Sequence, residues 1–204
     1  MNKITLIGNY DASQNTMTCK RLSNNYDVIP VTFPDVVKNP NKNGEFKFEG
    51  SIINQKGNVY VEVYNVEEAE GIVNSTACEL KGTIKKLYPV RVTKKGHKLQ
   101  DMLVEADNQL VKVVAFEPCP DFITTGLNVR VRGRLQSRAF TQLTTFGTLS
   151  KVVYEVALKN LEIIQEDEFD PFDMMDGLFE DVEPLDEGTT EEGDGENNWI
   201  RRFN

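Results

Sequence analysis

The 204-residue sequence contains few of the residues from which catalytic and metal-binding sites are built. It has one histidine, His97, which stands in a lysine-rich turn with no carboxylate beside it. It lacks the phosphate-binding Gly-x-x-x-x-Gly-Lys loop, the Gly-x-Ser-x-Gly motif of serine hydrolases and the His-Glu-x-x-His motif of zinc proteases. We therefore expect a protein that is not an enzyme and that binds no metal or cofactor.

Cysteines and long apolar runs are also scarce. Cys19, Cys78 and Cys119 are too scattered for a Cys-x-x-Cys metal site and too few for a disulfide framework, which fits a reducing compartment. The sequence has no run of about 18 apolar residues, so it predicts no membrane-spanning helix. Its first residues lack the long apolar stretch and cleavage site of a secretory signal. We expect a cytoplasmic protein without membrane contact.

Negative charge dominates the composition but not the whole length of the chain. The formal net charge is -9. Residues 166–204 contain 15 acidic and 2 basic residues, whereas residues 75–165 contain 14 basic and 8 acidic residues. A basic middle followed by an acidic tail indicates a nucleic-acid-binding protein whose tail has a separate role. The alternative is a tail that only improves solubility.

Alternation of apolar and polar residues predicts short strands along most of the chain before residue 165. Turn-forming residues separate them, for example at residues 54–57 and 107–108. The Ser/Thr-rich residues 141–150 are expected to form a mobile loop between the last two strands. The expected strands are Lys3–Asn9, Tyr26–Phe33, Glu45–Ile53, Asn58–Val66, Leu80–Leu87, Leu99–Ala106, Leu110–Phe116, Leu127–Phe140 and Lys151–Ile164.

These strands fall into two groups, which favours two small β-barrels over one sandwich. The alternation breaks at residues 67–74, where we place a boundary. The groups also resemble each other weakly, because Phe-Glu-Gly-Ser-Ile at residues 48–52 echoes Val-Arg-Gly-Arg-Leu at residues 131–135. The sequence therefore suggests an internal repeat.

Cations alternate along the expected strand 127–140. Such a row on one face repels itself unless an anion lies against it, and a chain of phosphates would supply that anion. The alternative is an ordinary solvated barrel surface. The residues on this face are Arg130, Arg132, Arg134, Gln136 and Arg138.

Aromatic residues accompany the cations. Non-specific binding of single strands uses such rings, because any base can stack on them for about 1–3 kcal/mol. Phe116 lies an even number of residues after Lys112, and Phe140 an even number after the arginines, so each ring is expected on the same strand face as those cations. Phe146 lies in the expected loop, where there is little core for it to join. For each ring, packing in the core is the alternative.

Three stretches of the chain resemble the bacterial-type single-stranded DNA-binding proteins. They are Val-Lys-Val-Val-Ala-Phe at residues 111–116, Gly-Leu-Asn-Val-Arg-Val-Arg-Gly-Arg-Leu-Gln-Ser-Arg-Ala-Phe at 126–140 and Tyr-Glu-Val-Ala-Leu-Lys-Asn-Leu-Glu-Ile-Ile at 154–164. Their order and spacing are those of the family. The additional front segment and a tail that ends Trp-Ile-Arg-Arg-Phe-Asn indicate a phage-encoded or otherwise divergent member.

The resemblance implies an all-β chain with an OB-fold barrel at residues 77–165. A smaller OB-like domain at residues 1–70 would precede this OB-fold domain (75–165), and a disordered acidic tail (166–204) would follow it. The implied function is sequence-independent binding and protection of single-stranded DNA during replication, recombination or repair. By motif position and charge, the candidate DNA-binding residues are Lys85, Lys86, Arg91, Lys94, Lys95, Lys98, Lys112, Phe116, Arg130, Arg132, Arg134, Arg138, Phe140 and Phe146.

The acidic tail interleaves apolar and acidic residues, a pattern that cannot form a core but can dock on a basic, hydrophobic groove of a partner. We expect it to recruit replication or repair proteins or to compete with DNA, in a chain that can form homo-oligomers. The alternative is an interaction protein that binds no DNA, such as a replication adaptor or an acidic DNA mimic. The candidate partner-binding residues are Phe169, Phe172, Met174, Met175, Leu178, Phe179, Trp199 and Phe203.

Overall fold

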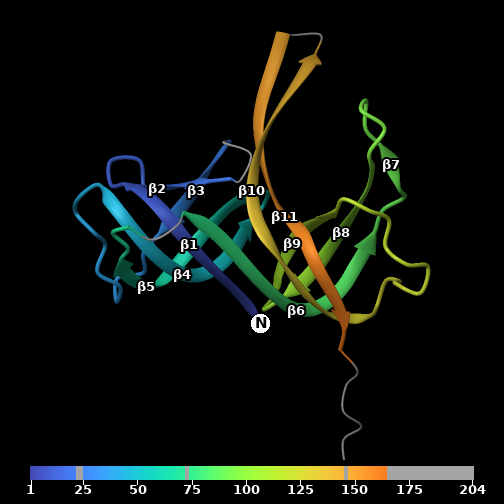
Figure 1. The fold of residues 1–204 in the computed structure, drawn as a ribbon, viewed down its shortest axis with the longest axis horizontal. Helices are drawn as coiled ribbons and strands as arrows, with labels where there is room; N and C mark the ends of the chain where they lie inside the picture. The colour runs from blue at the N-terminus through green and yellow to red at the C-terminus, as the bar shows by residue number, and fades with distance from the viewer. Residues whose placement is uncertain (22–24, 72–73, 145–146, 165–204) are drawn as a thin grey trace, which may run out of the picture. The chain divides into compact units, whose positions relative to one another are not determined.

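The computed structural model describes residues 1–21, 25–71, 74–144 and 147–164, and these residues form strands and turns only (Figure 1). None of them belongs to a helix that could span a membrane. The predicted all-β class is confirmed. The strands are β1 (Asn2–Asp11), β2 (Thr16–Lys20), β3 (Tyr26–Thr32), β4 (Gly44–Gln55), β5 (Asn58–Glu68), β6 (Ser75–Leu87), β7 (Arg91–Val92), β8 (Lys98–Ala106), β9 (Gln109–Ala115), β10 (Asn128–Thr144) and β11 (Gly147–Ile163).

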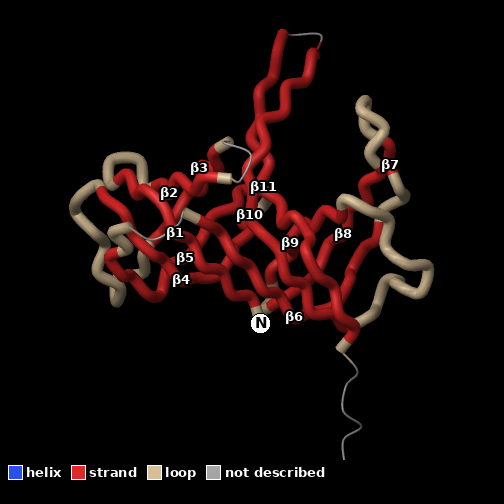
Figure 2. The backbone as a smooth tube through the Cα atoms, viewed as in Figure 1, coloured by secondary structure: helices blue, strands red, loops and turns tan. Residues whose placement is uncertain are grey.

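Strands β1 to β5 close into a small barrel. β1 pairs with β2 and β4, β2 pairs with β3, β4 pairs with β5, and a parallel contact between β3 and β5 completes the ring (Figure 2). Alternate side chains point inward, as the two-residue period of a strand requires. In β1, Ile4, Leu6 and Tyr10 are buried, whereas Lys3 and Asn9 are exposed.

Strands β6 and β8 to β11 close into a second barrel in the same way. β6 pairs with β8 and β10, β8 pairs with β9, β10 pairs with β11, and β9 and β11 are parallel. The short β7 pairs only with β8, beside the turn at residues 93–97. The prediction of an OB-type barrel over residues 77–165, preceded by a smaller barrel of the same kind, is confirmed.

The two barrels have largely the same strand register, which gives the suspected repeat a structural basis. Most pairings in the first barrel have a counterpart at the equivalent position of the second, whereas the shift between Ile84 and Lys86 in the β6–β8 pair has none in β1–β2. The counterparts include Met17↔Ile29 with Val104↔Val111, Val31↔Val61 with Val113↔Val156, Gly8↔Phe46 with Gly82↔Val129, and Ile4↔Gly50 with Cys78↔Gly133.

A β-bulge lies at the same place in both barrels, next to the glycines that the sequence pattern had matched. The extra residue is Tyr64 on β5, opposite Gly50, and Lys159 on β11, opposite Gly133. A Cβ atom on Gly50 would lie 2.3 Å from the Glu62 carbonyl oxygen, and one on Gly133 would also lie 2.3 Å from a carbonyl oxygen across the strand pair. Only glycine allows this close approach of two backbones.

Antiparallel pairing of β1 with β6 joins the two barrels into a continuous sheet, and the described residues form one compact unit. The pairing Ile4↔Cys78 brings together equivalent positions of the two barrels, so the junction has approximate two-fold symmetry. The contacts on either side of this pair repeat accordingly. Asn2 donates a side-chain hydrogen bond to the Ile52 carbonyl over 2.7 Å, and the equivalent Thr76 donates to the Leu135 carbonyl over 3.1 Å.

The expectation of a loop at residues 141–150 is wrong. β10 continues to Thr144 and β11 begins at Gly147, so the two strands form a long ribbon that extends away from the barrels (Figure 1). Threonine and other β-branched residues favour this conformation. The strand β2 was also not predicted, although its Met17 and Cys19 are buried at alternate positions.

Candidate nucleic-acid interface

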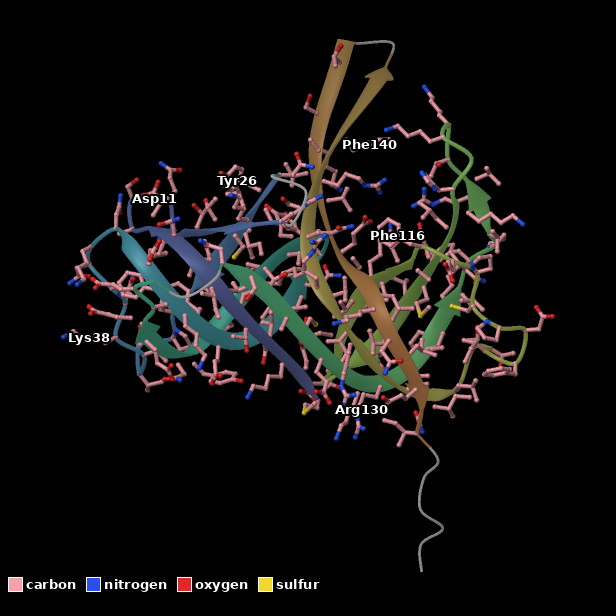
Figure 3. The ribbon with its side chains drawn as sticks, viewed as in Figure 1. Asp11, Tyr26, Lys38, Phe116, Arg130 and Phe140 are labelled. Atoms are coloured by element: carbon pink, nitrogen blue, oxygen red, sulfur yellow. The ribbon has the colours of Figure 1, made fainter. Side chains whose placement is uncertain are left out.

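Strand β10 presents the predicted row of cations on the outside of the second barrel. Val129, Val131 and Leu135 point inward and are buried, so the even-numbered residues lie on the other face of the strand, where Gln136 is also buried. The bulge lies on β11 and leaves the alternation along β10 intact. Arg130 and Phe140 are ten positions apart, which corresponds to about 33 Å along a strand. The row therefore spans two separate regions of the surface, and Arg130 lies at the end opposite Phe140 (Figure 3).

At the lower end of the row, carboxylates of the protein itself supply the anions. Arg130 lies 3.3 Å from Glu79 on β6 and 3.2 Å from Glu162 on β11. Arg132 lies 3.6 Å and 3.2 Å from the same two carboxylates. These four side chains balance in charge, so this end of β10 is explained without a bound phosphate.

Near the middle of the row, a buried carboxylate organises the cations. Glu155 on β11 is only 3 % exposed and lies opposite Gln136, whose side-chain amide donates a hydrogen bond to it over 3.2 Å. Its other oxygen lies 3.3 Å from Lys112 on β9 and 3.4 Å from Arg138. Two cations from different strands therefore converge on one acid.

The charge pattern continues onto β8. Asp101 lies 3.3 Å from Lys112 and 3.1 Å from Arg91, which follows the short loop after β6. Across β7, β8, β9, β11 and β10, three cations thus alternate with the two carboxylates Asp101 and Glu155. The alternation limits self-repulsion and leaves a positive excess on this face. We refer to Arg91, Asp101, Lys112, Glu155 and Arg138 as the central charge row.

Two aromatic rings flank the central charge row. Phe116 is 54 % exposed and follows β9, at an even spacing from the partly exposed Lys112. Phe140 is 48 % exposed and lies on β10 with the same parity as Arg138, at the base of the ribbon (Figure 3). Neither ring belongs to the buried core, so the alternative of a core role does not hold for these two residues.

The remaining candidate cations have varied surroundings. Lys85 forms an ion pair with Glu105 at 2.7 Å, and Lys86 lies 4.7 Å above the ring of Tyr88. Arg134 donates a hydrogen bond to the side chain of Gln136 over 3.1 Å. Within residues 1–21, 25–71, 74–144 and 147–164, no carboxylate lies within ion-pair distance of the three lysines of the 93–98 turn, which are exposed. These are Lys94, Lys95 and Lys98.

Other predicted residues lie outside the described part of the chain. This applies to the loop residue Phe146 and to all the candidate partner-binding residues of the tail. The latter are Phe169, Phe172, Met174, Met175, Leu178, Phe179, Trp199 and Phe203.

Sequence reasoning missed the acids of the central charge row and one exposed aromatic. Asp101 and Glu155 become neighbours of the cations only through pairing between strands, which periodicity does not reveal. Phe122 is exposed in the segment between β9 and β10. With Phe116 and Ile123 it lines a groove of about 670 Å³, beside the bulge residue Lys159. An aromatic in a segment rich in turn-forming residues was the available signal.

In the described ranges, no group of three or more histidine, cysteine or acidic side chains is arranged to hold a metal ion. Burial raises the pKa of the Cys19 and Cys78 thiols to about 12, so both remain protonated near neutral pH. A nearby negative charge adds to the effect of burial at each thiol, from Asp27 and Glu79 respectively. These thiols are therefore poor nucleophiles and poor metal ligands.

Comparison with known proteins identifies a likeness in fold rather than in sequence. No protein-family model matches the chain, and no curated protein matches its sequence. The wild-type single-stranded DNA binding protein from Thermus aquaticus matches in structure with a TM-score of 0.54 and 13 % identity, over 81 % of this chain and 93 % of that one. A deletion and substitution variant of the Thermus aquaticus protein matches with a TM-score of 0.50 and 16 % identity, over 82 % and 96 %. This chain therefore has the fold of a single-stranded DNA-binding protein.

Proposed function

We propose that the protein binds single-stranded DNA without sequence preference, on the outer face of its second barrel. The observation that carries the proposal is the pair of exposed rings, Phe116 and Phe140, on either side of the central charge row. Cations there can hold phosphates while bases stack on the rings, and neither contact depends on base identity.

The proposed path begins at the lysine turn. Lys94, Lys95 and Lys98 attract the phosphate chain, which then crosses β8 and β9 past Phe116 and reaches Phe140 on β10. The path also includes Arg91, Lys112 and Arg138 of the central charge row and the neighbouring Arg134 on β10. Lys85 and Lys86 on β6 complete the proposed set of cations.

Arg130 and Arg132 have a smaller part in this proposal. A phosphate that approached either guanidinium would have to displace Glu79 or Glu162, whose oxygens already lie within 3.6 Å. Exchange of one anion for another yields little net free energy when both charges are exposed to water. On β10, we therefore assign most of the affinity for DNA to the part that carries Arg138 and Phe140.

We further propose that the protein protects single strands that arise in replication, recombination or repair, in the cytoplasm of its host cell. The 15 acidic residues after Gln165 would recruit partner proteins or compete with DNA for the lysine turn. A homo-oligomer would lengthen the binding path. These functions rest on charge pattern and on the family resemblance, and a phage origin rests on the resemblance alone.

The test is a fluorescence anisotropy titration of labelled poly-thymidine with the full chain at several salt concentrations. We expect tight binding whose affinity falls steeply as salt rises, because bound counterions are released from the phosphates. A second titration uses a chain ending at Gln165, which should bind more tightly if the tail competes with DNA. Absence of binding by both folded proteins would refute the proposal and favour an adaptor or DNA mimic.

A further inference from the structure

The ribbon that carries Phe140 leaves the second barrel at a point where one edge of β10 has lost its strand partner. β10 pairs with β6 only as far as Gly133, whereas its pairing with β11 continues to Thr144. Beyond Gly133, the backbone groups on the free edge need other partners, because buried and half-buried amides are costly to leave unpaired. Side chains from the first half of the chain provide them.

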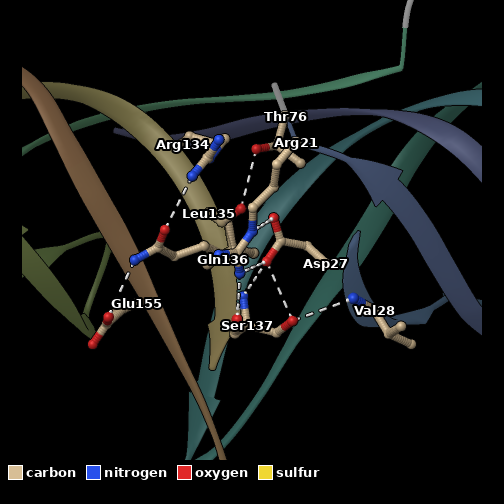
Figure 4. Close-up of polar contacts among 9 residues, drawn as sticks. All are labelled: Arg21, Asp27, Val28, Thr76, Arg134, Leu135, Gln136, Ser137 and Glu155. Atoms are coloured by element: carbon tan, nitrogen blue, oxygen red, sulfur yellow. Dashed lines mark hydrogen bonds and ion pairs between the residues drawn. The ribbon is translucent and has the colours of Figure 1, made fainter. Parts of the chain in front are cut away.

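The contacts concentrate on Ser137 (Figure 4). Its backbone N–H donates a hydrogen bond to Asp27 Oδ1 over 2.6 Å, and its hydroxyl donates to the same oxygen over 3.2 Å. Its carbonyl accepts a hydrogen bond from the guanidinium of Arg21, and its hydroxyl accepts one from the Val28 N–H over 3.3 Å. Residues around β3 therefore replace the missing strand at this position.

An ion pair holds the replacement in place. Asp27 is 1 % exposed, and Arg21 binds both of its oxygens, with Nε donating to Oδ2 over 2.8 Å. The hydrogen bond to Asp27 raises the pKa of the Arg21 guanidinium. A guanidinium that bonds both carboxylate oxygens fixes the direction as well as the distance of the contact. We call Arg21, Asp27 and Ser137 the ribbon clamp.

The equivalent place on the first barrel has a neutral contact instead. Asn54 occupies the position of Ser137, and its backbone N–H donates a hydrogen bond to the Gln109 side chain over 2.9 Å. Its own amide donates to the Leu110 carbonyl over 2.7 Å. Here the strands end at once in the turn at residues 56–57, so no ribbon has to be held. The charged version occurs where the long ribbon begins.

We propose that the ribbon clamp is a positioning device, through which the first barrel fixes the ribbon so that Arg138 and Phe140 face the DNA-binding surface. Ser137 directly precedes Arg138 and lies on the same strand, close to Phe140, so a restraint on its backbone also restrains theirs. A ribbon of two strands is otherwise weakly constrained. The role assigned to Phe140 rests on the proposed function, whereas the restraint on the ribbon does not.

The test compares Asp27→Asn with the matched variant Asn54→Ala. Amide hydrogen exchange at residues 137–140 should become about tenfold faster in Asp27→Asn, because hydrogen bonds to a charged group are about twice as strong as neutral ones. The dissociation constant for poly-thymidine should rise about three- to tenfold in the same variant. Asn54→Ala should change neither quantity, even where it lowers the unfolding temperature. Arg21→Lys, which keeps the charge but loses the two-pronged contact, serves if Asp27→Asn does not fold.

A double variant separates positioning from a general loss of stability. If Asp27 acts through the ribbon, Asp27→Asn should cost little affinity once Phe140→Ala has removed the ring, so the two effects should not add. Equal costs in both backgrounds, or unchanged ribbon exchange in Asp27→Asn, would overturn the proposal. If the wild-type chain binds no single strand, the proposed function fails, and hydrogen exchange still decides whether the clamp restrains the ribbon.

Discussion

Substitution of Phe140 by alanine tests the proposed binding surface most directly. The ring is 48 % exposed and lies outside the core, so its loss should lower the free energy of unfolding by only about 1 kcal/mol. If a base stacks on it, the same change should cost about 1–3 kcal/mol of binding free energy, a loss of roughly 5- to 150-fold in affinity. The expected effect on binding therefore exceeds that on folding.

The assay is the anisotropy titration with poly-thymidine, repeated at several salt concentrations. The slope of log affinity against log salt should stay as in the wild type, because alanine removes a stacking surface and no phosphate contact. The control is Tyr64→Ala, since Tyr64 is equally exposed at 50 % but lies at the bulge of the first barrel, outside the proposed path. This control should bind poly-thymidine as tightly as the wild type.

Three outcomes would refute the reasoning. A folded Phe140→Ala protein with less than a twofold loss of affinity would show that no base stacks there. An equal loss for Tyr64→Ala would show that the effect comes from exposed aromatics in general. A changed salt slope would show that the ribbon has moved and taken Arg138 with it.

Further predictions concern charge, packing and pH. Glu155→Gln should free Lys112 and Arg138 to bind phosphates, so poly-thymidine should bind more tightly. The slope of log affinity against log salt should steepen by about 0.7 for each phosphate gained. An unchanged slope would contradict the role proposed for the central charge row. Gly133→Ala places a Cβ atom 2.3 Å from a carbonyl oxygen, so the unfolding temperature measured in a thermal melt should fall by about 4 °C or more. An unfolding temperature equal to that of the wild type would contradict the close packing of the two backbones. In the folded protein, the Cys19 and Cys78 thiols have pKa values raised to about 12, which is above their pKa in the unfolded chain. The unfolded state therefore loses these protons at a lower pH than the folded state does. Denaturant titrations should show that the free energy of unfolding falls as pH rises from about 9 towards 12. Stability that is flat over that range would contradict the burial of these thiols.

Sequence periodicity predicted most of the fold because each strand buries one face. The alternation along β1, with Ile4, Leu6 and Tyr10 buried, is the pattern that a half-buried strand must have. The same reasoning correctly placed the arginines of β10 on the outer face. It failed at residues 141–150, where serine and threonine were interpreted as loop residues although β10 and β11 continue to pair there.

The candidate site was less predictable, since its neighbours come from distant parts of the chain. Periodicity indicates on which face Lys112 lies, but not that Glu155 of a later strand lies 3.3 Å away. The anion that the row of arginines requires was therefore assigned to DNA alone, whereas Glu79 and Glu162 neutralise its lower end. The clamp residue Asp27 belongs to the first barrel and had no sequence signal linking it to the second.

The pairing of β1 with β6 has an evolutionary consequence. In a symmetric pair of identical subunits, every substitution appears at both equivalent places. Two halves in one chain escape that constraint, and these halves have diverged: Ile53 pairs with Tyr60 where the second barrel pairs Gln136 with Glu155. Because both barrels belong to one chain, they also stay together at any dilution. The two barrels of one chain can therefore carry different residues at equivalent positions.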